Sequence, residues 1–232
     1  FAQLGKSTVY KYPNDEPINL DKPSLQVNPI DTLTYAAGEI VKAYHGIEPR
    51  LAVNLQIDEY SSLKASYNRM RQYIHLISNT TAATPVDIYM PSGEYIRPAI
   101  ADQVAMGYFR NFFSNKYESS VEVYYKKFTD LVDYKDEAEL LLNNALETEL
   151  FIGQGQAYGL EVQIKKKRGN LTGWISYTLS RAERQVDQIN NGDPYPANWD
   201  KTHDLSLVVS YDITDRMNIS SNFAYMTGRP IT

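Results

Sequence analysis

The stretch from Ala157 to Arg181, AYGLEVQIKKKRGNLTGWISYTLSR, constrains the fold of this chain more than any other. Apolar and polar residues alternate on both sides of Gly169-Asn170, and a basic cluster, Lys165 to Arg168, leads into that dipeptide. Successive side chains of a β-strand point to opposite faces. Two such segments joined by a Gly-Asn turn therefore predict a β-hairpin.

This hairpin fits either of two kinds of β-protein. Its first arm, Ala157 to Arg168, has the length of a strand that crosses a bilayer, about 9–11 tilted residues. One face is apolar with Tyr near its ends and the other is polar, which suits a wall between lipid and a water-filled lumen. A hairpin of a soluble β-sandwich alternates in the same way. The hairpin alone does not separate the two.

The lengths of the connections favour the barrel wall. Short and long connections between expected strands alternate along the whole chain. An up-and-down barrel places all short turns at one rim and all long loops at the other, as outer-membrane barrels do. A Greek-key sandwich has no reason to sort its loops in this way. The short connections are 58–61, 113–116, 169–170 and 214–216, and the long ones are 13–48, 78–100, 133–156 and 181–201.

We therefore expect an all-β fold, an antiparallel up-and-down transmembrane β-barrel segment of about nine strands. Residues 133–152 fit a short helix or extended strands with a turn at Asn143-Asn144, and we favour strands because both neighbours are strands. Single-chain bacterial barrels have even strand numbers, and nine strands leave two open edges. Residues 1–232 are thus expected to be an interior part of a larger barrel. The expected strands are 1–12, 51–57, 63–76, 101–112, 117–134, 157–168, 171–181, 205–211 and 217–225.

Composition excludes several classes of function. The net charge of −5 argues against nucleic acid as a partner. Cysteine is absent, so the chain has no disulfides, thiolate metal site or cysteine nucleophile. No apolar run reaches the roughly 18 residues of a transmembrane helix, and no N-terminal signal segment is recognisable. The 19 Tyr residues suit an interface that is apolar on one side and wet on the other.

Six segments from position 48 onward carry a resemblance to a known family. They are EPRLAVNLQI (48–57), SSLKASYNRMRQYIHLISNT (61–80), IADQVAMGYFRNF (100–112), YESSVEVYYK (117–126), QAYGLEVQIKKKRGNLTGWISYTLSR (156–181) and YPANWDKTHDLSLVVSY (195–211). The pairing of AYGLE with GWISYTLSR, followed by a strand that starts at DKTHD, is the most specific part. In these segments the chain resembles the TonB-dependent outer-membrane receptors of the Bacteroidetes type, whereas the segment before Glu48 matches only loosely.

The resemblance implies the C-terminal part of a 22-stranded barrel in the Gram-negative outer membrane, with a plug domain in its lumen. Such receptors take up a scarce nutrient, of the siderophore, cobalamin, glycan or peptide class, by energy-coupled movement of the plug. The implied partners are outer-membrane lipid, the plug, the inner-membrane TonB complex and the nutrient, and a surface lipoprotein is left open. The plug, the first barrel strands and the last strands lie outside these residues. A plug-less porin-like channel and a soluble carbohydrate-binding β-domain are the alternatives.

No enzymatic activity, cofactor or metal site is expected. His45, His75 and His203 lack metal-ligand spacing, and no Ser-His-Asp arrangement is recognisable. The acidic residues between Asp133 and Glu149 are interpreted as a solvated loop face rather than as a cation site.

The expected ligand-binding residues lie on the long-loop side. Aromatic rings offer stacking area for sugars or chelates, and Arg pairs with anionic groups. The candidates are Arg69, Arg71, Gln72, Tyr89, Tyr95, Arg97, Tyr195 and Trp199.

Overall fold

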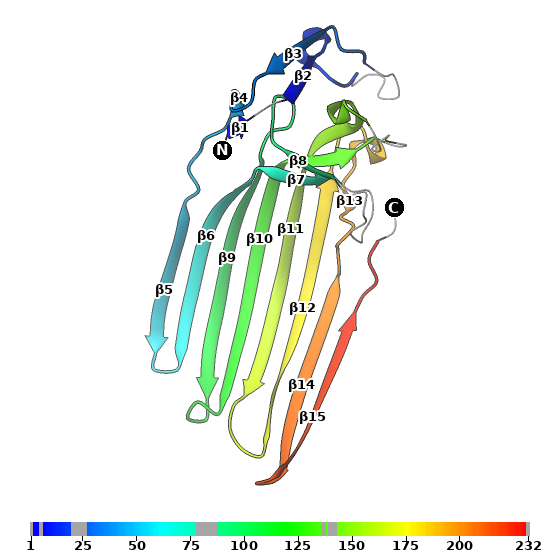
Figure 1. The fold of residues 1–232 in the computed structure, drawn as a ribbon. Coiled ribbons are helices and arrows are strands. Elements are labelled where there is room, and N and C mark those ends of the chain that lie inside the picture. Colours follow the sequence, from blue (N-terminus) through cyan, green and yellow to red (C-terminus); the bar gives the residue numbers. More distant parts are fainter. Residues whose placement is uncertain are drawn as a thin grey trace.

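The structure is a computed structural model that describes residues 2–4, 7–19, 27–77, 88–135, 138 and 143–230. One antiparallel sheet dominates it (Figure 1), and its long strands lie side by side in chain order. A two-residue strand, β13 (Tyr195–Pro196), pairs with β12 and is the ninth strand of this sheet. The predicted antiparallel, up-and-down sheet of about nine strands is thus confirmed. The long strands are β5 (Arg50–Asp58), β6 (Ser61–Gln72), β9 (Ala99–Phe112), β10 (Tyr117–Tyr134), β11 (Leu150–Lys166), β12 (Leu171–Gln185), β14 (His203–Thr214) and β15 (Met217–Met226).

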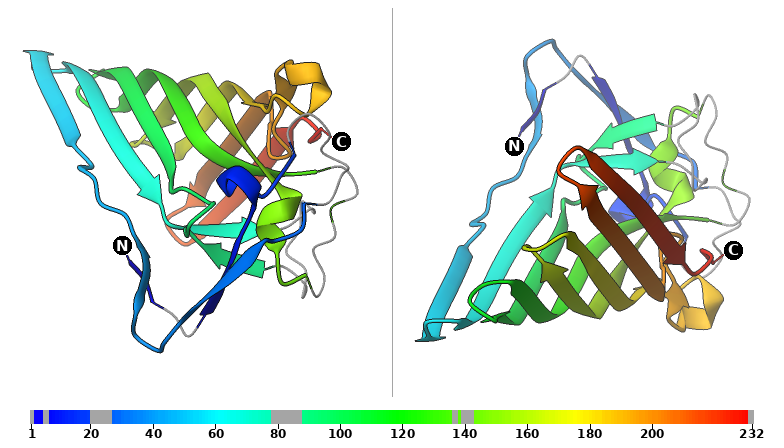
Figure 2. Two further views of the ribbon diagram at one scale, coloured as in Figure 1. Left: turned by 90° about the horizontal axis from the view of Figure 1, so that it is seen from above. Right: turned by 90° about the horizontal axis from the view of Figure 1, so that it is seen from below.

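The connections are sorted as their lengths predicted. The short turns β5–β6, β9–β10, β11–β12 and β14–β15 all lie at the lower end of the sheet in Figure 1, and the long connections lie at the upper end. The sheet is open, with β5 and β15 at its two edges. Figure 2 shows that it is curved and that the segment before β5 lies to one side of it.

The N-terminal segment differs from the prediction. Residues 1–12 were expected to form a strand of the wall, but β1 (Ala2–Leu4) pairs with β4 (Ile40–Ala43) and β2 (Ser7–Lys11) pairs with β3 (Asp31–Tyr35). These small sheets lie above the wall (Figure 1). A short 3₁₀ turn, η1 (Pro13–Asp15), follows β2 because Pro at its start cannot continue a ladder. The alternation of residues 1–12 could not identify their partner strand.

The strand expected over 63–76 ends earlier than predicted. β6 stops at Gln72, and β7 (Ile74–Ile77) forms a separate hairpin with β8 (Ile88–Pro91). The segment 78–100 therefore contains a strand and is not all loop; residues 78–87 lie outside the described residues. The hairpin lies across the upper end of the sheet in Figure 1.

The ambiguous segment 133–152 is extended at both ends. β10 continues to Tyr134, β11 starts at Leu150, and a 3₁₀ turn, η2 (Leu146–Glu149), precedes β11. Leu140 to Leu142, on which the helical alternative depended, lie outside the described residues. A third 3₁₀ turn, η3 (Asn190–Gly192), follows β12.

The described core is small and lies at the long-loop end. One cluster contains Ile18, Phe151 and Val186, and another contains Ile96 and Leu150. The wall itself encloses no core. A β-sandwich would seal the alternating Leu, Val and Ile side chains in its interior, but they are exposed, Leu55 by 58% and Val121 by 44%. The sandwich alternative is therefore wrong for the described residues.

Candidate functional site

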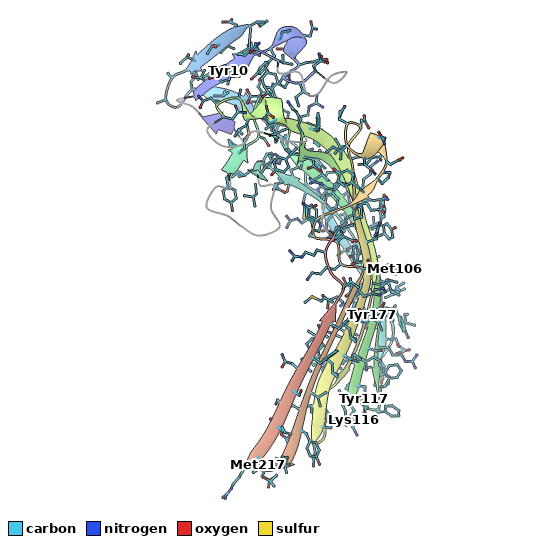
Figure 3. All side chains as sticks on the ribbon, turned by 90° about the vertical axis from the view of Figure 1, so that its right-hand side faces the viewer. Tyr10, Met106, Lys116, Tyr117, Tyr177 and Met217 are labelled. Atoms are coloured by element: carbon cyan, nitrogen blue, oxygen red, sulfur yellow. The ribbon has the colours of Figure 1, made fainter. Side chains whose placement is uncertain are left out.

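One face of the sheet is apolar across its whole width. Strand register aligns one residue from each of the eight long strands in a row without an Asp, Glu, Lys or Arg. We call this side the apolar face; Met106, Tyr117 and Tyr177 mark it in Figure 3. No other described element covers this row, because its large side chains are exposed or only partly buried. The row is Leu55, Leu63, Tyr108, Val121, Val162, Tyr177, Leu205 and Tyr225.

The opposite face is polar. One register step away, the neighbouring row carries Lys64, Glu122, Glu161 and Asp204. Because a step of one residue moves a side chain to the other face, the charged row lies directly behind the apolar one. Asn54, Thr178 and Met226 complete it, and Gly107 lies between Lys64 and Glu122. We call this side the polar face.

Tyrosines mark the upper margin of the apolar face. Their rings lie in the apolar band while their hydroxyls reach the polar row above. The Tyr67 hydroxyl donates to Asp102 Oδ1 at 2.6 Å, and the Tyr125 hydroxyl donates to Gln156 Oε1 at 3.2 Å. Arg69 pairs with both oxygens of Asp102, at 2.7 and 2.9 Å. This arrangement of an apolar ring below a wet tip is typical of an interface between apolar and aqueous surroundings.

A second aromatic group marks the lower margin, beside the short turns. Phe112, Tyr117 and Lys166 are aligned in one row of the apolar face. The rings of Phe113 and Tyr117 meet edge to face with centroids 5.9 Å apart. Lys166 Nζ lies 5.9 Å from the centroid of Tyr117. The apolar band is therefore bounded at both ends by aromatic residues with cations nearby.

A cavity of about 330 Å³ opens at the upper end of the polar face. We call it the Trp199 cavity. By the two-residue period, Gln72 of β6 and Arg184 of β12 project from the polar face, and β7 contributes His75. The cavity is lined in part by Gln72, His75, Asp133, Arg184, Trp199 and Arg229.

An ion pair holds the wall of this cavity together. Arg184 Nη1 lies 3.0 Å from Asp133 Oδ2, and Arg184 Nη2 donates to the Val132 carbonyl at 2.7 Å. The hydroxyl of Tyr195 donates to Asp133 Oδ2 at 2.5 Å. Burial and the hydrogen bond to the Asp133 carboxylate raise the pKa of Tyr195, so the phenol stays protonated at neutral pH. β10, β12 and β13 are thereby joined at one point.

His75 is a buried histidine on the floor of the cavity. Its side chain is 5% exposed, and its Nε2 lies 3.1 Å from the hydroxyl oxygen of Ser92, which is fully buried. Burial lowers the pKa of His75, and a hydrogen bond with the backbone of Arg97 only partly opposes this shift. The imidazole is therefore neutral at pH 7.

The structure divides the predicted binding residues into separate groups. Gln72 and Trp199 line the Trp199 cavity, and Tyr195 contacts its ion pair. Arg69 lies on the apolar face instead, bound to Asp102. The guanidinium of Arg71 lies against the backbone of Gly46. Tyr89 in β8 is 70% exposed and lines neither this cavity nor the one described next.

Tyr95 and Arg97 line a different cavity, of about 500 Å³, together with Ile96, Glu147 and Phe151. Tyr95 has a structural role there. Its hydroxyl donates to the Tyr10 carbonyl at 3.0 Å, and its ring meets that of Tyr12 edge to face with centroids 5.4 Å apart. The eight predicted residues thus do not form one site, and their role in binding stays a prediction.

Most residues that line the Trp199 cavity were missed by the sequence prediction, among them Asp133, Arg184 and Arg229. Asp133 was interpreted as part of a solvated loop face, but it is largely buried in an ion pair with Arg184. Arg184 could have been found by extending the alternation of β12, which places it on the same face as Thr178. No sequence pattern indicated a role for Arg229, because it lies beyond the last strand and outside any alternation of apolar and polar residues.

Two further classes of feature are lacking in the described part of the chain. Its Asp, Glu and His side chains nowhere gather in a group of three or more suited to a metal ion. None of its helices has the length and hydropathy needed to span a membrane.

A fold similar to that of this chain occurs in a solved structure. Neither the known family models nor the curated proteins contain a match to this sequence. Among solved structures, the chain is similar to one in the structure of the FpvAI–pyocin S2 complex, with a TM-score of 0.53 at 13% identity. The similarity covers 84% of this chain and 24% of the other, so this chain spans about a quarter of its neighbour's length. The neighbour is a TonB-dependent receptor, and the chain shares its β fold.

Proposed function

We propose that residues 1–232 form part of the barrel wall of a non-enzymatic outer-membrane receptor that takes up a scarce nutrient. One observation supports this proposal above the others. A charge-free row crosses all eight long strands on one face, and a charged row lies directly behind it. A wall with lipid on one side and water on the other requires this pattern.

The dimensions of the apolar face agree with this proposal. On β10, the marginal tyrosines Tyr117 and Tyr125 are eight residues apart. At about 3.3 Å per residue this separation is roughly 26 Å along the strand. The apolar band of an outer-membrane barrel is about 25 Å tall and lies between two girdles of aromatic residues. The two groups of tyrosines would then lie at the two lipid headgroup layers.

The finer proposal follows the resemblance to the Bacteroidetes-type receptors. The long-loop rim would face the outside of the cell and the short turns the periplasm. A plug supplied by another part of the protein would contact the polar face and couple uptake to the inner-membrane TonB complex. The neighbour was solved in complex with pyocin S2, and this protein partner agrees with a receptor-type role.

Cysteine labelling tests the membrane location. Residues 1–232 contain no cysteine, and any cysteine elsewhere in the full-length protein is first replaced by serine. Asp193→Cys lies in a long loop and Asp215→Cys in a short turn, and both positions are exposed. In intact cells that express the full-length protein, a membrane-impermeant maleimide should label Asp193→Cys and leave Asp215→Cys unlabelled. In lysed cells both should react. Equal labelling of the two variants in intact cells would exclude the proposed orientation.

A conductance measurement separates the receptor from a passive channel with the same wall. Full-length protein reconstituted in a planar bilayer should remain closed if a plug fills the lumen. A porin-like channel would conduct continuously. A stable open current from the full-length protein would replace the receptor proposal by the porin alternative.

A further inference from the structure

We propose that the Trp199 cavity binds an acidic sugar, a ring that stacks on Trp199 and carries one carboxylate that pairs with Arg229. The inference rests on the proposed function in taking this cavity as the place where the imported ligand binds. Its chemistry follows from the cavity alone.

Trp199 supplies a platform for a ring. The side chain is 55% exposed although it lines a cavity. It also borders a second cavity of about 350 Å³, lower on the polar face, which Tyr124, Lys126 and Asp204 line. Arg184 lies over the ring, with its Cζ 5.4 Å from the ring centroid. Arg184 occupies one side of the ring, and among the described contacts the indole N–H has no acceptor, so the other side of the ring and the donor remain for a ligand.

The charges in the cavity favour a single anionic group. Asp133 neutralises Arg184 at 3.0 Å, and His75 is buried and neutral. In the described part of the chain no carboxylate lies within ion-pair distance of Arg229. Among the described residues the cavity therefore has one uncompensated cation, and a guanidinium pairs well with a planar carboxylate. A ligand with one negative charge balances it.

The remaining polar groups suit hydroxyls. Gln72 uses one amide proton for the Ile74 carbonyl at 2.8 Å. Its other amide proton and its carbonyl oxygen have no described partner. The amide proton can donate to a ligand hydroxyl, and the carbonyl oxygen can accept from one. Arg184 Nε is a further buried donor without an acceptor. Amides and an exposed aromatic ring favour a sugar over an aromatic acid, which has no hydroxyls to satisfy them. A volume of about 330 Å³ is at the small end of ligand sites.

The test uses the full-length protein in detergent and three probes: D-glucuronate, methyl β-D-glucoside and benzoate. Binding is followed by calorimetry. Because one charge-assisted hydrogen bond is worth about tenfold in affinity or more, glucuronate should bind at least about tenfold more tightly than the neutral glucoside. Equal binding of these two sugars, or tighter binding of benzoate, would overturn the assignment.

Substitutions locate the site. Trp199→Ala should lose glucuronate binding by about tenfold or more, and Trp199→Phe should restore most of it. Arg229→Gln should abolish the preference for glucuronate over the glucoside and leave glucoside binding unchanged. Trp174→Phe and Arg168→Gln are matched controls near the other rim and should bind as the wild type. Retained preference in Arg229→Gln, or unchanged affinity in Trp199→Ala, would refute the site.

The two proposals fail separately. Correct cysteine labelling without glucuronate binding refutes the cavity inference and leaves the receptor proposal in place. Glucuronate binding with the wrong labelling pattern refutes the receptor proposal and leaves the binding of glucuronate by the cavity in place. In Trp199→Phe, a circular dichroism spectrum like that of the wild type reports that the variant has folded.

Discussion

The guanidinium of Arg184 lies over the indole of Trp199, with its Cζ 5.4 Å from the ring centroid. Arg184 is in turn fixed by Asp133 at 3.0 Å, and Asp133 accepts a hydrogen bond from Tyr195. The position of the exposed Trp199 ring thus depends on the largely buried ion pair between Arg184 and Asp133. Three strands of the sheet contribute to this relationship, so it couples the upper wall to the loop that carries Trp199.

Removing Asp133 should destabilise the protein strongly. In Asp133→Asn the Arg184 charge would remain largely buried without a partner, and breaking a buried pair costs about 3 kcal/mol. The midpoint of urea unfolding in detergent measures this cost. Asp102→Asn is the matched control, because its pair with Arg69 is 31% and 39% exposed whereas the Asp133 and Arg184 side chains are 14% and 13% exposed. The exposed pair should cost about 1 kcal/mol or less. Equal costs for the two variants would contradict the structure.

The hairpin of β7 and β8 should loosen in mild acid. The pKa of buried His75 is lowered from 6.5, so the folded state prefers the neutral imidazole. Its contribution to stability is fully present above pH 6.5, the pKa of the unfolded chain, and is lost as the pH falls through the lower folded pKa. Protection factors for hydrogen exchange of residues 74–77, which are corrected for the slower intrinsic exchange at low pH, should therefore be lower at pH 5 than at pH 7.5.

His75→Gln supplies the control for this pH dependence. Glutamine keeps a polar group that can face Ser92 but does not titrate. Exchange in the hairpin of this variant should change between the two pH values only by the intrinsic chemistry of the amides. The same loss of protection at pH 5 in the variant as in the wild type would assign the effect to another group.

The wall could be predicted from sequence because its signals are local. Alternation in each strand identifies the two faces, and the turn at Gly169-Asn170 fixes the register of β11 and β12. The sorted connection lengths gave the meander order without any knowledge of contacts. Residues 1–12 show that local sequence signals do not identify the partner of a strand. They were expected to form the upper end of one wall strand but form two short strands, and no local signal indicated that β3 and β4 would be the partners of β2 and β1.

The cavity was only partly predictable because it forms between distant segments. Gln72 and Trp199 were identified as polar or aromatic residues on the long-loop side. Which of the eight candidates meet depends on the tertiary arrangement of the long connections. Tyr95, for example, packs against Tyr12 and does not line this cavity. Asp133 and Arg184 are 51 positions apart and are brought together by strand register, which composition does not encode.

Gly173 should tolerate no side chain. Its φ is +148°, and a Cβ placed there would lie 2.1 Å from the carbonyl oxygen of Val208 in the paired strand β14. That neighbour is backbone and cannot rotate away, so Gly173→Ala should break the pairing of β12 with β14 locally and lower the yield of folded protein in detergent. Gly228→Ala is the matched control, since nothing lies within 4 Å of a Cβ there and its φ is ordinary. A Gly173→Ala protein as stable as Gly228→Ala would exclude this register.

The two faces of β10 can be compared at adjacent residues. Val121 belongs to the charge-free row, and Ser120 projects from the polar face with Gln163 as its partner on β11. If the apolar face contacts lipid, Val121→Arg should cost about 2–4 kcal/mol, the cost of an arginine near the midplane of a bilayer. Ser120→Arg should cost far less, because a water-filled lumen solvates the guanidinium.

Folding of the full-length protein into lipid vesicles measures this difference, and a repetition in detergent micelles separates lipid from packing. A cost for Val121→Arg that arises from membrane burial should shrink when the bilayer is replaced by micelles, which deform around a charge. A cost that arises from contacts within the protein should persist in micelles. Equal tolerance of arginine at both positions in vesicles would mean that the apolar face does not contact hydrocarbon, and the membrane assignment of the wall would then be wrong.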